Sequence, residues 1–94
     1  MSIVDQAVTA LSEKISGGFD GIAKFVIDGE GSIMIDGDGV RAGDEDADVT
    51  LTADAETFQG ILEGDVNPTT AFMTGKLSVD GDMGKAMALG GLLC

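Results

Sequence analysis

Residues 48–62 read DVTLTADAETFQGIL, a stretch in which a strand signal is followed directly by a helix signal. Val49 and Leu51 alternate with threonines, which predicts a strand with one face toward the core and one toward water. Asp54 then stands at the position expected for a helix N-cap. The apolar residues that follow at helical spacing are Phe58, Ile61 and Leu62. The stretch predicts a strand and then a helix that ends near Gly64.

Downstream of this stretch, the sequence predicts a short helical turn, a strand and a last helix. Pro68 suits the first position of the turn, because its fixed φ is already helical. Residues 76–80 alternate like a half-buried strand, and Asp82 is a suitable cap for the final helix. Gly90 and Gly91 are expected to loosen the end of that helix. The apolar side chains of these elements are Ala71, Phe72, Met73, Leu77, Val79, Met83, Ala86 and Met87.

Upstream of the stretch, the first fifteen residues have the pattern of an amphipathic helix. Ser2 and Asp5 have the spacing of a capping box, and Gly17 and Gly18 follow as a helix stop. Its apolar positions are Val4, Val8, Leu11 and Ile15. These residues predict a helix that packs one side against the rest of the chain.

Three short strands are predicted between this helix and the opening stretch. Residues 24–28 and 32–36 flank a glycine-rich turn, which is typical of a hairpin, and a third strand is expected over 40–42. The side chains on one face of the hairpin are Phe25, Ile27, Ile33 and Ile35. The order of elements predicts an α+β fold with a mixed sheet covered on one face by helices.

The composition excludes several classes of function. The chain has 94 residues, which is enough for a single domain over 1–94, and 17 acidic against 5 basic side chains give a net charge of −12. This charge repels nucleic acid and anionic membrane surfaces. With no histidine, a catalytic triad or a zinc site is not expected, and we predict neither an enzyme nor a cofactor.

Four runs and one aromatic residue follow one another in a characteristic order: ADVTLT at 47–52, Phe58, ILEG at 61–64, NPTTAFMTGKL at 67–77 and GDMGKAM at 81–87. Together they resemble the sterol carrier protein 2 domain family. The resemblance implies a five-stranded, mainly antiparallel sheet in the order 3-2-1-4-5, with helices on one face and an apolar tunnel between the layers. It also implies non-catalytic binding of a fatty acid, fatty acyl-CoA, phospholipid or sterol.

The candidate tunnel lining is a set of large apolar side chains. It comprises Phe25, Ile35, Phe58, Ile61, Leu62, Phe72, Met73, Leu77, Met83, Met87 and Leu92. Flexible methionines suit a ligand whose length and bend vary. The competing interpretation is an ordinary core, because a small domain needs such residues to fill its interior. Spacing alone favours the core, and the resemblance favours the tunnel.

Two further interpretations of the chain belong to other functional classes. The same apolar face can pack against a partner protein or a second copy, as an accessory module in a lipid or quinone pathway. Alternatively, Asp44, Asp46 and Asp48 fall at the first, third and fifth positions of a calcium loop. Val49 then stands where the motif requires glycine, so a solvated acidic loop is the preferred interpretation.

We find no recognisable signal for secretion or for membrane insertion in the sequence. The start MSIVDQAV lacks the basic and apolar regions of a signal peptide, and no apolar run is long enough to span a bilayer. The single Cys94 cannot form an intrachain disulfide. We therefore expect a cytoplasmic protein without stable membrane insertion.

Overall fold

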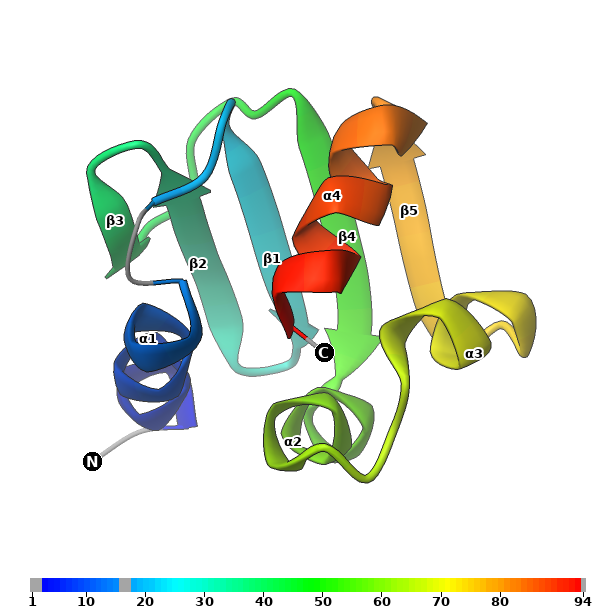
Figure 1. The fold of residues 1–94 in the computed structure, drawn as a ribbon. Coiled ribbons are helices and arrows are strands. Elements are labelled where there is room, and N and C mark those ends of the chain that lie inside the picture. Colours follow the sequence, from blue (N-terminus) through cyan, green and yellow to red (C-terminus); the bar gives the residue numbers. More distant parts are fainter. Residues whose placement is uncertain (1–2, 16–17, 94) are drawn as a thin grey trace.

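Five strands form one mixed sheet in the spatial order β3-β2-β1-β4-β5 (Figure 1). The structure, a computed structural model, describes residues 3–15 and 18–93. The strands are β1 (Ala23–Asp28), β2 (Gly31–Asp36), β3 (Gly39–Ala42), β4 (Val49–Asp54) and β5 (Leu77–Gly81). β1 runs parallel to β4, and every other neighbouring pair is antiparallel. The predicted α+β fold and strand order are confirmed.

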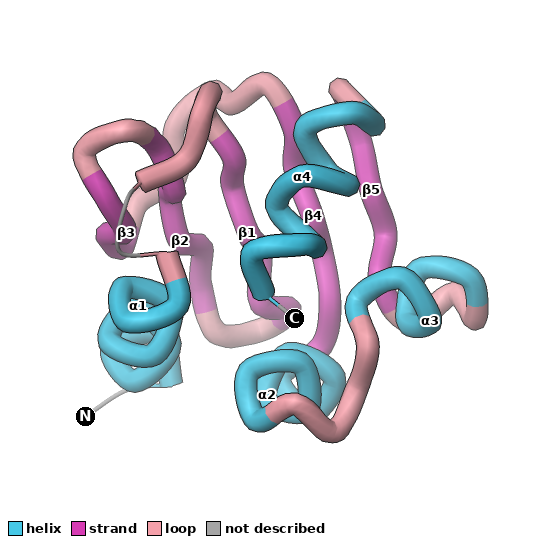
Figure 2. Tube along the Cα trace, viewed as in Figure 1, coloured by secondary structure: helices cyan, strands magenta, loops and turns pink. Residues whose placement is uncertain are grey.

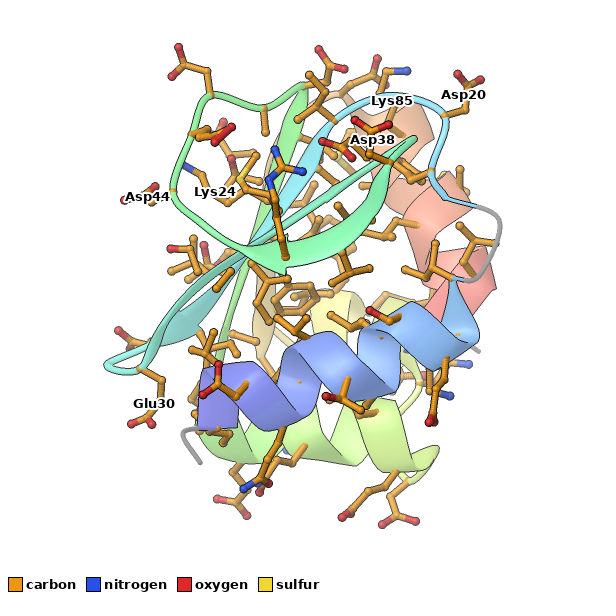
Figure 3. All side chains as sticks on the ribbon, turned by 90° about the vertical axis from the view of Figure 1, so that its left-hand side faces the viewer. Asp20, Lys24, Glu30, Asp38, Asp44 and Lys85 are labelled. Atoms are coloured by element: carbon orange, nitrogen blue, oxygen red, sulfur yellow. The ribbon has the colours of Figure 1, made fainter. Side chains whose placement is uncertain are left out.

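Four helices lie in front of this sheet in Figure 2, on the same side. They are α1 (Ile3–Lys14), α2 (Ala55–Glu63), α3 (Pro68–Met73) and α4 (Met83–Leu93). The view from the side separates the sheet from the helices that cover it (Figure 3). The expectations for Ser2, Gly17 and Cys94 fall outside the described residues. In the part of the chain that is described, none of the helices has the length and apolarity required to cross a membrane.

The ends of α2 are defined by the residues that the sequence predicts for them. The Asp54 carboxylate accepts a hydrogen bond of 2.7 Å from the backbone N–H of Thr57, as an N-cap does. Gly64 adopts φ 85° at the other end, and its N–H donates to the last helical carbonyls. A left-handed residue at this point favours glycine, because a Cβ would be strained there.

The core fills the space between the sheet and the helices, and all four helices contribute buried residues to it. In β1, Ala23, Phe25 and Ile27 are buried and alternate with less buried residues, as the period of a strand requires. The ring of Phe25 meets that of Phe58 from α2 edge to face, with 4.4 Å between their centroids. These contacts join the central strand to the helix layer. Of the predicted apolar positions of the first helix, Val4, Leu11 and Ile15 are buried and Val8 is partly buried, and Ala7 is buried in addition.

Two local expectations differ from the structure. Helix α4 does not loosen at Gly90 and Gly91 but continues to Leu93. Two glycines disfavour a helix by about 2 kcal/mol relative to alanine, and burial of Leu89 in the core offsets this cost. The helix-free face of the sheet is also not uniformly wet, because Met34 on that face is fully buried. The loop between β3 and β4 covers Met34, and the backbone N–H of Glu45 in this loop lies 3.5 Å from the Met34 sulfur.

Candidate ligand-binding groove

An apolar groove of about 310 Å³ lies at the β5 edge of the sheet, between α3 and α4. Its floor is made by strands β4 and β5, where Leu51 stands opposite Val79 in the antiparallel register. Directly opposed residues share a face of the sheet, so both side chains point toward the helix layer. The complete lining is Leu51, Pro68, Thr69, Phe72, Met73, Leu77, Val79, Met83, Ala86, Met87 and Gly90.

Helix α3 forms one wall of the groove, and hydrogen bonds hold both of its ends in place. The Asn67 side chain accepts hydrogen bonds from the backbone N–H groups of Thr69 and Thr70, at 2.8 and 3.3 Å. At the other end, the Lys76 N–H donates to the carbonyl of Ala71, at 2.9 Å. Ala71 is buried beneath the helix, whereas Phe72 and Met73 lie at the rim.

Helix α4 forms the other wall and is attached to the sheet by the two residues that precede it. Gly81 adopts φ 107° and passes so close to the Asp48 carbonyl that a Cβ would collide with it. The next residue, Asp82, donates its N–H to the same carbonyl at 3.0 Å. The Asp82 side chain also accepts from the N–H of Lys85 at 3.1 Å, as a helix cap. This geometry aims the Met83–Met87 flank of α4 at the groove.

The groove gathers most of the exposed large apolar side chains of the molecule. Six such side chains are found among residues 3–15 and 18–92, whose side chains the structure describes, and four of them line this groove. Their exposed fractions are 42% for Phe72, 78% for Met73, 44% for Met83 and 75% for Met87. Contiguous exposed apolar surface is uncommon in folded proteins and marks sites for ligands or partners. We therefore take this corner as the candidate site.

The lining of the groove is predominantly apolar. None of the described residues that line it carries a charge, and Thr69 is the one lining residue with a hydroxyl. The groups with shifted pKa values lie outside the lining and are the Asp36 and Asp54 carboxyl groups and the Arg41 guanidinium, whose pKa the hydrogen bond to Asp36 raises. A hydrogen bond from Arg41 lowers the pKa of Asp36, and backbone and side-chain hydrogen bonds from Thr57 lower the pKa of Asp54. The lining itself contains no acid–base pair.

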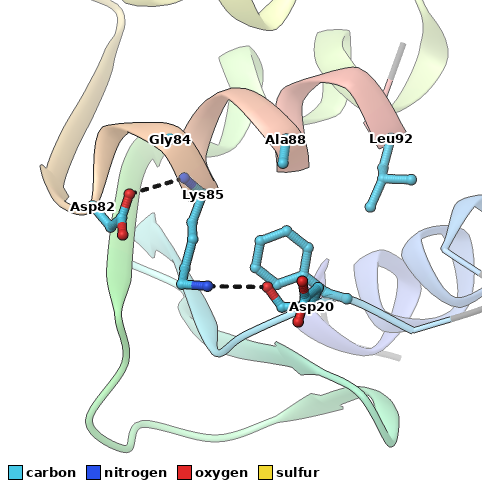
Figure 4. A pocket seen from close by; sticks show the side chains of 7 residues that line it. Asp20, Asp82, Gly84, Lys85, Ala88 and Leu92 are labelled. Carbon is cyan, nitrogen blue, oxygen red and sulfur yellow. Dashed lines mark hydrogen bonds between the residues drawn. The ribbon is translucent and has the colours of Figure 1, made fainter.

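A second, more open hollow of about 440 Å³ lies on the opposite flank of α4 (Figure 4). Asp20, Asp82 and Lys85 contribute to its lining, and Lys85 Nζ donates a hydrogen bond of 3.3 Å to the Asp20 carbonyl. This contact ties α4 to the segment before β1. The hollow is therefore partly polar, unlike the groove.

The structure distributes the eleven predicted lining residues over several places. Five of them line the groove: Phe72, Met73, Leu77, Met83 and Met87. Leu92 lies in the hollow on the other flank of α4. Leu62 and Phe58 border a smaller hollow between α1 and α2. The remaining residues, Phe25, Ile35 and Ile61, are buried in the core, as is Phe58.

The family resemblance implies an internal tunnel, and at this place the structure has a groove that is open at the surface. A passage through the interior stays a prediction. Six lining residues were not among the predicted ones: Leu51, Pro68, Thr69, Val79, Ala86 and Gly90. Alternation marked Leu51 and Val79 as inward-facing, but it did not distinguish a groove floor from a core. The contact between α3 and α4 depends on tertiary packing, which no short motif encodes.

The acidic loop before β4 has structural contacts instead of the geometry of a calcium site. Asp44 forms an ion pair of 2.8 Å with Lys24, and Glu45 forms one of 3.2 Å with Arg41. Asp48 accepts a hydrogen bond from the Ile22 N–H at 3.1 Å. Over the described ranges, no group of three or more potential ligand side chains is placed to hold a metal ion.

Two curated relatives are similar to the chain in sequence. A hydroxysteroid dehydrogenase-like protein 2 of Xenopus laevis is 40% identical over 77 residues, covering 73% of this chain and 18% of that protein. A fatty acid-binding protein of Yarrowia lipolytica is 44% identical over 57 residues, covering 61% of this chain and 44% of its own length. The chain thus spans less than half the length of these relatives.

A solved structure shares the fold over the whole chain. The sterol carrier protein 2 of Aedes aegypti in complex with palmitate superposes with a TM-score of 0.80 at 20% identity, covering 100% of this chain and 97% of that one. The family model of the SCP-2 sterol transfer family matches residues 5–94. The motifs, the strand order and this match agree, and the chain belongs to the SCP-2 sterol transfer family.

Proposed function

We propose that the chain binds a long apolar lipid in the groove between α3, β5 and α4, and that it holds this ligand without chemical change. The observation that carries the proposal is the convergence of four exposed apolar side chains on a groove without a charged lining residue among those described. Water solvates such a surface poorly, so an apolar ligand that covers it is favoured. The similar proteins named for fatty acid binding and for a palmitate complex support the same ligand class.

The energetics of such binding are favourable. A sixteen-carbon chain contributes about 12 kcal/mol when all its methylenes leave water, whereas micromolar affinity requires about 8 kcal/mol net. The difference is available for the cost of ordering the ligand. The groove volume of about 310 Å³ is at the low end for ligand sites. The flexible Met73 and Met87 side chains at the rim are therefore expected to fold over the part of the ligand that the groove leaves exposed.

The lining also supports binding without catalysis. Catalysis of acyl transfer or hydrolysis needs a nucleophile activated by a neighbouring base. Thr69 supplies the one hydroxyl of the lining, and the lining residues that the structure describes include no acid or base beside it. We therefore expect the ligand to be recovered unaltered.

Native mass spectrometry tests this proposal directly. We expect the protein as purified to retain one lipid per chain. After delipidation, addition of palmitic acid or hexadecanol should increase the mass by one ligand per chain. Met87→Gln removes apolar contact from the groove and should weaken binding about tenfold, equivalent to about 1.4 kcal/mol. Ala88→Gln is the matched control, because residue 88 lies on the other flank of the same helix. A lipid-free dimer that binds neither palmitic acid nor hexadecanol would instead support the protein-interaction alternative.

A further inference from the structure

We propose that the groove selects its ligand by headgroup charge, so that lipids with neutral or cationic headgroups bind more tightly than anionic ones of the same tail. The preferred class is long-chain alcohols, esters and sterols, and the disfavoured class is ionised fatty acids and thioesters that carry phosphate. This inference rests on the proposed function, because it concerns the same groove.

The first observation is that the groove offers an anion nothing to pair with. A carboxylate buried or half-buried at a protein surface needs a cation or several N–H donors near it. None of the described lining side chains is a lysine or an arginine, and the single polar side chain in the lining is Thr69. A carboxylate headgroup must therefore stay in water at the mouth.

The second observation is that most basic side chains are occupied elsewhere. Lys24 pairs with Asp44 at 2.8 Å, and Arg41 pairs with Asp36 at 2.7 Å and with Glu45 at 3.2 Å. Lys85 points to the other flank of α4, where its ammonium donates to the Asp20 carbonyl (Figure 4). These three cations are thus engaged with acidic or carbonyl oxygens instead of facing the groove, and Lys14 lies in the last turn of α1, outside the groove lining.

Lys76 is the cation that needs a separate test. It directly precedes Leu77, which lines the groove, and its side chain is not itself part of the lining. Its charge acts on Asp54, where it contributes to lowering the pKa of that carboxyl group. None of the ion pairs among the described residues involves Lys76, so a substitution at this position decides whether an anionic headgroup uses it.

The third observation is the charge of the whole molecule. A net charge of −12 is spread over a body of 32 × 31 × 21 Å, so the mouth of the groove lies in a negative potential. With screened Coulomb interactions at 0.15 M salt, this potential weakens binding about fivefold for each negative charge on the headgroup. The same arithmetic gives about thirtyfold at 0.01 M salt and about twofold at 1 M salt. Headgroup selection should therefore depend steeply on ionic strength.

Three amphiphiles with the same twelve-carbon tail test this inference: dodecanoate, dodecanol and dodecyltrimethylammonium. Their affinities are measured by displacement of the neutral fluorescent probe N-phenyl-1-naphthylamine, below the micelle concentration, at three salt concentrations. Dodecanol serves as the reference at each salt, because salting-out of the tail is common to all three. We expect dodecanol to bind about fivefold more tightly than dodecanoate at 0.15 M salt, with a gap that widens at low salt and narrows at 1 M. The cationic amphiphile should show the opposite salt dependence.

Two results would overturn the inference while leaving the proposed function intact. One is binding of dodecanoate as tight as that of dodecanol at all three salt concentrations. The other is a loss of tenfold or more in dodecanoate affinity in Lys76→Gln with dodecanol unaffected, since it would place the carboxylate on that lysine. Under our inference, this variant changes dodecanoate affinity by about twofold or less. If none of the three amphiphiles binds, either by displacing the probe or together with it, the proposed function is wrong, and so is the inference.

Discussion

The helix-covered side of the sheet contains two regions built from the same kinds of residue but packed to different degrees. Where α2 packs on the central strand β1, Phe25 and Phe58 are fully buried and contact each other. At the β5 edge, Met73 and Met87 leave about three quarters of their surface exposed. Both regions are apolar, so composition does not separate core from site. The difference arises from what covers each region.

The position of each region in the sheet explains the difference. β1 has a strand on either side, and α2 packs over it while α1 covers the neighbouring strands β2 and β3. β5 is an edge strand, with β4 on one side and the six residues of α3 beside it. A short helix covers little area, and α4 turns Leu89 inward while Met83 and Met87 face the groove. The edge of the sheet is therefore where apolar surface remains available for a ligand.

The largest effect expected from this comparison is the loss of a core aromatic. Phe58→Ala should lower the free energy of unfolding by about 3–5 kcal/mol, because it leaves a cavity beneath Phe25. A domain of this size has a small stability margin, so the variant should be largely unfolded. Urea denaturation followed by circular dichroism measures this. Phe72→Ala at the groove rim is the matched control, and an equal loss there would remove the distinction between the two regions.

A smaller effect is expected from two substitutions two residues apart in α4. Leu89→Ala deletes a fully buried side chain and should cost about 2–5 kcal/mol. Met87→Ala deletes a mostly exposed one, so stability should change by about 0.5 kcal/mol or less while lipid affinity falls. Thermal denaturation and lipid titration of both variants provide the comparison. Similar destabilisation by the two would show that Met87 belongs to the core.

The smallest of the three effects concerns the cap that starts α2. Hydrogen bonds from Thr57 lower the pKa of Asp54 in the folded state. Its contribution to stability is therefore present above the unfolded pKa of about 3.9 and is lost as the pH falls through the folded value. Asp54→Ala should thus destabilise the protein at pH 7 by less than either core substitution, and the difference from the unaltered protein should shrink at pH 3.

A second variant at the same position separates capping from titration. Asp54→Asn retains a side chain that can cap the helix but does not ionise. Its stability relative to the unaltered protein should rise as the pH falls from 7 to 3, as measured by urea denaturation at both values. A stability difference that is independent of pH would show that Asp54 is not the titrating group.

Local patterns predicted the elements of the fold well because their causes are local. Alternation in Val49–Thr52 and the cap at Asp54 are properties of neighbouring residues, and the structure confirms both. The end of α4 was predicted less well. Glycine propensity alone argued for an early end, whereas burial of Leu89 extends the helix to Leu93. The burial of Met34 was also missed, because the loop that covers it follows later in the chain.

The sequence by itself determined the family, the order of the elements and the apolar, strongly acidic character of the protein, since these follow from residue types and short spacings. Only the tertiary structure decided which apolar residues form the core and which form the groove. Phe58 and Phe72 have the same side chain and both lie in helices, yet the first packs on Phe25 and the second stays at a rim. Burial depends on which distant strand and helix cover a residue, and that coverage arises only when the chain folds.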